Sequence, residues 1–354
     1  MTLTPRPSRM KAARVLLGVA AASSLLLVTA CGGSDADAGT EGADYGTVDV
    51  NLSWIKNAEF AGLYFADANG YYEEAGFSEV NLIAGGPSGT STEAMVLSGG
   101  ALVGTSSPVG VAPVIVEEDA PLKIIGTTYQ KNPFAIISLD AAIAAPEDLV
   151  GRKIGVQAGV NETLFDALLE VNGIDAASVE KVPVQYDTQP LVNGEVDGFF
   201  GYLTNEALTL ELAGQPPTLL LFADHGLPFI AESFVTTDEA IETRREELKA
   251  FLEASLRGWK DAVDDAEESA RLAVEEYGAD LNLDVAKEIR QAEEQNTKLV
   301  VTEETEANGL FTVSEELMQQ NIDILKLAGF DLTAEQVFDM SLLAEVLEEN
   351  PELK

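Results

Sequence analysis

A polar turn with a tryptophan at its edge is the first feature of this sequence that could bind a small molecule. Residues 53–77 read SWIKNAEFAGLYFADANGYYEEAGF. This stretch follows a strand-like segment and ends with the pattern of a helix. Trp54 would therefore stand at the carboxyl end of a strand, where ligands bind in α/β sheets. Packing of the rings in a core is the alternative for Trp54 and Tyr64. The candidate ligand contacts of this stretch are Trp54, Asn57, Glu59 and Tyr64.

The segment GYLTNEA (201–207) places two more polar side chains just beyond a strand end. Asn205 and Glu206 stand at an expected helix start, where the helix dipole stabilises a carboxylate. Glu206 could accept paired hydrogen bonds from the edge of an aminopyrimidine or a similar ring, whereas an anion would call for arginine or free backbone donors. An exposed acid in the first turn of the helix is the alternative for Glu206. Tyr202 and Tyr186 could stack on a flat ligand or pack in the core.

Two stretches of small residues could supply backbone N–H groups to the same ligand. The segments GTSSPVG (104–110) and QAGVNET (157–163) each join a strand to a helix. Helix N-termini can bind anionic groups without a charged side chain, although an acid at 162 argues against an anionic ligand. Phe134 could close over the ligand as a further ring. The candidate contacts of the two stretches are Ser106, Ser107, Asn161 and Glu162.

Sequence patterns of catalysis and metal binding are not found. The chain has no Cys/His cluster, no G-x-S-x-G elbow and no P-loop lysine, and its one histidine, His225, has no evident partner. Carboxylates are so numerous that pairing two of them as an acid and a base would be arbitrary. We therefore expect no catalytic residue, no metal and no cofactor.

The N-terminus has the features of a secretion signal. Four basic residues precede the apolar run 15–30, which is shorter than a typical membrane-spanning helix. The following cysteine is the only one, so no disulfide can form within the chain, and LLLVTAC resembles a bacterial lipobox. We expect a signal peptide at 1–30, a lipid on Cys31 and a flexible acidic tether at 31–46. A secretory signal with an incidental cysteine is the alternative.

The net charge of −39 makes nucleic-acid binding a poor interpretation. The acidic residues are spread along helix-like segments and do not form one block, which is typical of a solvated surface. We therefore draw no conclusion about the ligand from the overall charge.

Short strands alternate with helices from the tether to about residue 231, and the remainder is almost wholly helical. This alternation predicts an α/β fold with parallel β-α units. The segments 95–107 and 190–202 share one outline, a helix, a glycine, a strand and small residues, which predicts two lobes of related design. A cleft between such lobes lies at the carboxyl ends of their strands. The expected boundaries are 47–133 with 232–354 for lobe 1, and 134–231 for lobe 2.

Four segments together resemble the substrate-binding proteins of ABC importers, and more closely the family that groups aliphatic-sulfonate binders with binders of thiamine-pyrimidine precursors. They are AGLYFADANGYYEEAGF behind Trp54, LSGGALVGTS, EDLVGRKIGV and NGEVDGFFGYLTNEA. The resemblance covers about residues 48–347. It implies a type II periplasmic-binding-protein fold, with a hinge between two lobes and a helical C-terminal region.

The resemblance also implies a function. The protein would capture a small molecule between its lobes and deliver it to an ABC permease, as a monomer held on the outer face of the cell membrane by the lipid on Cys31. An acid at the position of Glu206 is similar to what pyrimidine-precursor binders use. The expected ligand is therefore a thiamine pyrimidine precursor, then a riboflavin-like heterocycle, then a sulfonate or nitrate.

Two other classes of function stay open. A related branch of this fold is a pyrimidine synthase that uses a histidine and a lysine-held pyridoxal phosphate, but the matching segment 104–113 has neither residue, and 225–234 lacks that branch's cysteines. A lipoprotein that signals the presence of its ligand to a partner is the third class. We expect a binding protein and not an enzyme.

Overall fold

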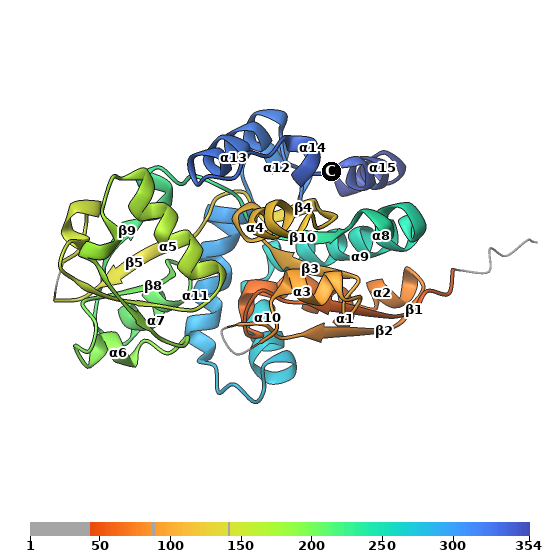
Figure 1. The fold of residues 1–354 in the computed structure, drawn as a ribbon. Coiled ribbons are helices and arrows are strands. Elements are labelled where there is room, and N and C mark those ends of the chain that lie inside the picture. Colours follow the sequence, from red (N-terminus) through yellow and green to blue (C-terminus); the bar gives the residue numbers. More distant parts are fainter. Residues whose placement is uncertain (1–42, 87–88, 141) are drawn as a thin grey trace, which may run out of the picture. The chain divides into compact units, whose positions relative to one another are not determined.

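The computed structural model describes residues 43–86, 89–140 and 142–354 (Figure 1). The expected signal peptide and Cys31 lie outside these residues, as does most of the expected tether. The described residues belong to one compact unit. Among the helices of this part of the chain, none combines the length and the apolar content that a membrane span needs.

Sheet A has five strands in the order β2-β1-β3-β10-β4. Strand β1 is parallel to β2 and β3, whereas β10 is antiparallel to both β3 and β4. Alternating side chains of a strand point to the same face, and Val48 and Val50 of β1 are accordingly both fully buried. The strands are β1 Gly46–Asn51, β2 Phe77–Ile83, β3 Val103–Ser106, β4 Leu122–Tyr129 and β10 Ala231–Thr237.

Sheet B also has five strands, in the order β7-β6-β8-β5-β9. Strand β6 is parallel to β7 and β8, and β5 is antiparallel to β8 and β9. The two mixed sheets with their helices confirm the predicted α/β class. The strands are β5 Phe134–Ser138, β6 Lys153–Val156, β7 Glu180–Pro183, β8 Gly198–Tyr202 and β9 Thr218–Leu221.

The chain crosses between the sheets twice, from β4 to β5 and from β9 to β10. Asn132 connects the two crossing segments, because its amide oxygen accepts the N–H of Phe134 at 3.1 Å while its amide nitrogen donates to the carbonyl of Leu227. One side chain therefore holds the outgoing and returning segments together.

Helices surround both sheets, and several are capped where the sequence has serine or threonine. Ser107 caps α4, since its hydroxyl accepts the N–H of Gly110 at 3.2 Å, and Pro108 occupies the first helical position. The helices up to α7 are α1 Ala61–Ala68, α2 Tyr71–Glu74, α3 Thr92–Leu97, α4 Pro108–Glu118, α5 Val160–Val171, α6 Gln189–Val192 and α7 Glu206–Leu212.

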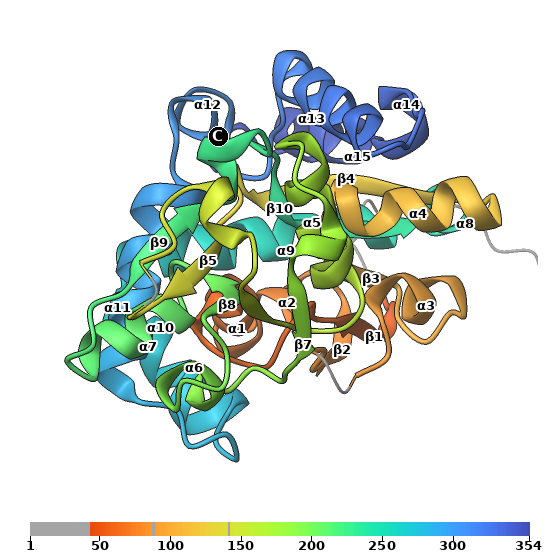
Figure 2. The ribbon, with the colours of Figure 1, turned by 60° about the vertical axis from the view of Figure 1, so that its left-hand side comes forward.

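The chain after β10 is almost wholly helical and returns to sheet A. Helix α9 packs on α1 and α2, and α14 and α15 pack on β4. Helix α11 instead contacts α7 on one side and the short 3₁₀ helix η1 (Ala58–Phe60) on the other, so it lies beside both sheets (Figures 1 and 2). These helices are α8 Asp238–Thr243, α9 Arg245–Asp264, α10 Ala266–Arg271, α11 Val285–Gln295, α12 Glu303–Asn308, α13 Glu315–Leu327, α14 Ala334–Val337 and α15 Ser341–Glu349.

Helix α9 is amphipathic, and its buried face approaches α1 very closely. Six of its buried residues follow the spacing of one helix face: Leu248, Phe251, Leu252, Ser255, Leu256 and Trp259. A Cβ atom on Gly258 would meet the carbonyl oxygen of Gly62 at 2.1 Å, and one on Gly62 would meet the ring of Trp259 at 2.1 Å. The two helices can therefore approach this closely only because both glycines lack a side chain.

Gly258→Ala should lower the free energy of unfolding by about 1–3 kcal/mol, because the added methyl group overpacks the contact between α1 and α9. The measurement is urea unfolding followed by circular dichroism. Glu253→Ala on the same helix, which adds no atoms to that contact, should have a much smaller effect. Equal stability of Gly258→Ala and the wild type would contradict the close packing.

Candidate functional site

A cavity of about 330 Å³ lies between the two sheets. Sheet A supplies the segments that follow β1, β2 and β3, together with the start of β10. Sheet B supplies the start of β5, the segments that follow β6 and β8, and the start of α7. The carboxyl ends of parallel strands thus meet at this cavity, which is the usual place for a ligand in open α/β sheets.

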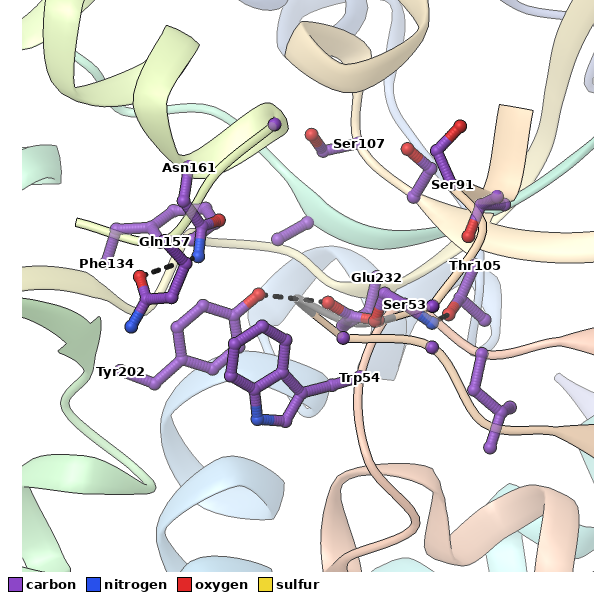
Figure 3. Close-up of a pocket in the computed structure, with 18 of the residues that line it drawn as sticks. Ser53, Trp54, Ser91, Thr105, Ser107, Phe134, Gln157, Asn161, Tyr202 and Glu232 are labelled. Carbon is purple, nitrogen blue, oxygen red and sulfur yellow. Dashed lines mark hydrogen bonds between the residues drawn. The ribbon is translucent and has the colours of Figure 1, made fainter. Parts of the chain in front are cut away.

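Eight of the candidate residues predicted from the sequence line this cavity. They come from both sheets, and most of them are drawn in Figure 3. The eight are Trp54, Ser106, Ser107, Phe134, Asn161, Tyr202, Asn205 and Glu206.

Aromatic rings form part of the wall. Phe134 and Tyr202 make an edge-to-face pair, with ring centroids 4.8 Å apart and planes at 80°. Trp54 lies beside Tyr202 in Figure 3. The indole N–H of Trp54 has no hydrogen-bond partner within the described residues, although its nitrogen is buried. The site therefore offers ring surface to a ligand.

Several polar side chains of the wall are already hydrogen-bonded to one another. The Ser106 hydroxyl donates to Glu93 Oε1 at 2.5 Å, and the Asn161 amide donates to Gln157 Oε1 at 3.1 Å. Gln157 in turn donates to the carbonyl of Phe200 at 3.0 Å. Such a network holds these groups in fixed positions before any ligand arrives.

Glu206 caps its own strand-to-helix turn. One carboxylate oxygen accepts the backbone N–H of Tyr202 at 2.8 Å, and the other accepts the Asn205 side-chain amide at 3.0 Å. Burial raises the pKa of Glu206, and the backbone N–H bonds oppose that shift. Part of the acceptor capacity of this carboxylate is therefore used inside the protein, and the rest faces the cavity.

Glu232 is a cavity residue that we did not predict from the sequence. Its carboxylate accepts the Ser53 hydroxyl at 2.6 Å and the Tyr202 hydroxyl at 3.0 Å (Figure 3). Its φ of 48° lies in the left-handed region, which is rare for a residue other than glycine in a strand. The acid comes directly after the first residue of β10, where the chain re-enters sheet A, and this position was the one signal that could have identified it.

Glu59 lies behind Glu232, with only 1% of its surface exposed. Asn57 caps η1 by accepting the backbone N–H of Glu59 at 3.0 Å. Within the described part of the chain, neither carboxylate oxygen of Glu59 has a hydrogen-bond donor. Burial and the facing carboxyl group of Glu232 raise the pKa of Glu59 well above the usual value of a glutamate.

The structure does not bring the remaining candidates to the cavity wall. Tyr64 is fully buried and stacks on Tyr277, with centroids 4.3 Å apart, because it lies on the inner face of α1. Glu162 forms an ion pair with Lys181 at 3.0 Å, and Tyr186 is 46% exposed. The candidates placed elsewhere are Asn57, Glu59, Tyr64, Glu162 and Tyr186.

The charge of the cavity is acidic. Glu93, Glu206 and Glu232 line it, and the described lining residues include no lysine, arginine or histidine. Lys287 of α11 is a nearby cation that lies outside the wall, and it is ion-paired with Glu288 at 3.0 Å. The described residues also hold no group of three or more metal-binding side chains placed to share an ion.

Two curated relatives match this sequence. The chain is 28% identical over 233 residues to "Riboflavin-binding protein RibY" of Chloroflexus aurantiacus, a match that covers 64% of this chain and 66% of that protein, just under two thirds of its length. It is 25% identical over 236 residues to "4-amino-5-hydroxymethyl-2-methylpyrimidine phosphate synthase" of Legionella pneumophila, which covers 64% of this chain and 72% of that protein.

Solved structures and a family model agree with the fold described above. A putative periplasmic sulfonate-binding protein of an ABC transporter from Methylobacillus flagellatus superposes with a TM-score of 0.61 at 16% identity, covering 88% of this chain and 96% of the other. This likeness confirms the periplasmic-binding-protein fold. The model described as "NMT1/THI5 like" matches residues 57–269, more than half of the sequence. The chain therefore belongs to the NMT1/THI5-like family.

Proposed function

We propose that this protein is the solute-binding component of an ABC importer and captures a small nitrogen heterocycle between its two sheets. The observation that carries the proposal is the composition of the cavity, in which rings of Trp54, Phe134 and Tyr202 stand beside carboxylates. Flat ligands gain from ring contacts, and carboxylates accept hydrogen bonds from ring N–H and amino groups. The periplasmic-binding-protein fold supports the same function by analogy.

An acidic cavity favours a neutral or cationic ligand over an anion. A sulfonate or nitrate would lie against three carboxylates, without a basic side chain among the described lining residues to offset the repulsion. We therefore place these anions last among the ligands, behind a thiamine pyrimidine precursor and a riboflavin-like heterocycle. The relative named as a riboflavin-binding protein supports the riboflavin-like alternative, and the acid at Glu206 supports the pyrimidine.

The enzyme alternative has less support from the residues. The synthase relative makes this alternative worth testing, but the described wall contains neither lysine nor cysteine. His225 lies in the 3₁₀ helix η4 (Phe222–His225), which does not contribute to the wall. A lysine-held cofactor would therefore lack its attachment point in this cavity. Conversion of any ligand during incubation would favour the enzyme instead.

Capture requires that the two sheets move relative to each other. We propose lobe 1 as 47–133 and 232–354, lobe 2 as 134–231, and the two crossing segments as the hinge. Asn132 joins both segments, so it would keep them moving as one. The closed protein would then dock on the permease as a monomer. A sensor that reports the ligand to a partner would use the same closure.

Calorimetry on a soluble fragment covering 45–354 should identify the ligand. The panel comprises hydroxymethyl- and formylamino-aminopyrimidines, thiamine, riboflavin, an alkanesulfonate and nitrate. We expect tight binding of one heterocycle and no binding of the two anions, since the wall is acidic. Tight binding of the sulfonate or nitrate would overturn the proposed ligand class. If none of the compounds binds, the pyrimidine and the riboflavin assignments are both overturned.

Tryptophan fluorescence should report the same binding event. The chain has two tryptophans: Trp54 lines the cavity, and Trp259 is 1% exposed in the core. Ligand should change the emission of the wild type, whereas Trp54→Phe should remove the change and keep the Trp259 signal as a control for folding. An undiminished ligand response in Trp54→Phe would place the ligand elsewhere.

Cys31→Ser should release the full-length protein from bacterial membranes, because the lipid would have no attachment site. The measurement is the distribution of the protein between the membrane and soluble fractions of a bacterial host. As a control, the variant Ser34→Ala keeps Cys31 and should leave the protein in the membrane fraction. Persistence of the Cys31→Ser protein in that fraction would point to an uncleaved N-terminal anchor.

A further inference from the structure

Two buried carboxyl groups lie close together at the cavity, that of Glu232 in its wall and that of Glu59 outside the wall. Glu59 and Glu232 are 1% and 4% exposed, and each carboxyl group is close enough to influence the protonation of the other. Two ionised carboxylates in such contact repel strongly in a medium of low dielectric constant. One proton between them removes the repulsion and creates a hydrogen bond.

The donors around the pair determine which residue carries that proton. Glu232 accepts hydrogen bonds from Ser53 and Tyr202, and both stabilise its ionised form. Glu59 has no donor in the described chain, so its ionised form would be both buried and unpaired. Burial and Glu232 raise the pKa of Glu59 accordingly. The proton therefore belongs on Glu59, which donates to an ionised Glu232.

Other titratable groups near the pair do not replace this proton. Burial raises the pKa values of three surrounding tyrosines, which stay neutral. Lys287 attracts the carboxyl group of Glu59, but its ammonium group already binds Glu288 and Gln291. The groups that face the pair from its neighbouring elements are Tyr64, Tyr129, Tyr202, Glu206, Lys287 and Glu288.

The backbone of Glu232 indicates that its position matters. The residues on either side pair with β4 in register, Ala231 with Tyr129 and Ser233 with Thr127, while Glu232 between them has a φ of 48°. Conformations of this kind persist where the surrounding structure enforces them, and they cluster at functional sites. Glu232, which has this unusual backbone conformation, is also the residue whose carboxylate lines the cavity.

We infer that Glu232 is the specificity-determining residue of the cavity, selecting a ligand that presents an N–H donor or a positive charge, and that protonated Glu59 positions it from behind. The inference rests on the proposed function, because it names the group of the ligand that the binding site reads. It adds a role for two residues that lie outside the strand-to-helix turn of Glu206.

The first arm of the test needs no ligand. Wild type, Glu59→Gln and Glu59→Met are compared by thermal unfolding between pH 5 and pH 8. Because the pKa of Glu59 is raised in the folded protein, the folded state holds a proton that the unfolded state loses above the ordinary glutamate range. Stability of the wild type should therefore fall as pH rises, relative to Glu59→Gln. A difference in Tm that does not change with pH would overturn the protonation of Glu59.

The second arm measures affinity, with hydroxymethyl-aminopyrimidine, riboflavin and thiamine as probes. Thiamine carries a permanent positive charge in addition to an amino group, whereas riboflavin offers a ring N–H without a charge, so the comparison shows whether a positive charge adds to binding. For a probe that binds, Glu232→Gln should weaken binding about 10-fold or more, since it loses a charged acceptor. Glu59→Gln should stay within about 3-fold of the wild type, because its amide still donates to Glu232, whereas Glu59→Met should weaken binding.

The control is Glu211→Gln, which removes one exposed carboxylate from α7 and should match the wild type in both arms. Unchanged affinity in Glu232→Gln, with a probe that binds the wild type, would overturn the selecting role and leave the proposed function intact. Equal losses in Glu59→Gln and Glu59→Met would overturn the positioning role. If no probe binds the wild type, the proposed ligand class fails together with the selecting role, and the thermal arm still decides the state of Glu59.

Discussion

Strand β10 is hydrogen-bonded along both of its edges, antiparallel to β3 and to β4. It is the only strand of sheet A that the chain adds after building sheet B, so the first sheet is completed only when the chain returns. The helices that pack on sheet A late in the chain, α14 and α15, come after β10 in the sequence. The cavity depends on it as well, because the first residues of β10 form part of the wall.

Burial of charge is the second constraint on this region. The carboxylates at the cavity and behind it cannot all be ionised without donors or cations nearby. Helix α11 supplies part of the compensation, since Lys287 pairs with Glu288, and Glu288 accepts the backbone N–H of Ala58 at the start of η1 at 2.7 Å. A helix far along the sequence thereby fixes the turn that carries Glu59. The C-terminal region is thus part of the electrostatics of the site, although it contributes none of the lining.

Much of the fold could be predicted from the sequence because it depends on local signals. The strand and helix alternation, the glycine-rich turns and the apolar faces of helices such as α9 are all visible in the order of residues. The same signals placed Trp54, Tyr202 and Glu206 at strand ends and Phe134 at the crossover between the lobes, and the structure brings these four together at the cavity. Their positions follow from the rule that a ligand cleft between two α/β lobes lies at the carboxyl ends of the strands.

The rest of the site depends on contacts between distant segments. Tyr64 was a reasonable candidate as a ring in the first helix, but its direction is set by Tyr277, more than 200 residues later. Glu162 has an ion-pair partner, Lys181, that no spacing rule could indicate. Glu232 was missed for the same reason, since its partners Ser53 and Tyr202 come from two different sheets. Acids are common in this chain, and only tertiary contact distinguishes one from another.

The bond between Tyr202 and Glu232 has a consequence for the open protein. Its donor belongs to sheet B and its acceptor to sheet A, so it exists only at one separation of the two sheets. A movement that parts the sheets by a few ångströms removes this donor and lets water reach the carboxylate. The carboxylate of Glu232 would then lose a hydrogen-bond donor that offsets its negative charge, and this charge would attract a cationic solute into the cavity before any close contact is made. The Tyr202–Glu232 bond would therefore stabilise the arrangement of the sheets described here, while its loss would help the separated sheets to attract a cationic ligand.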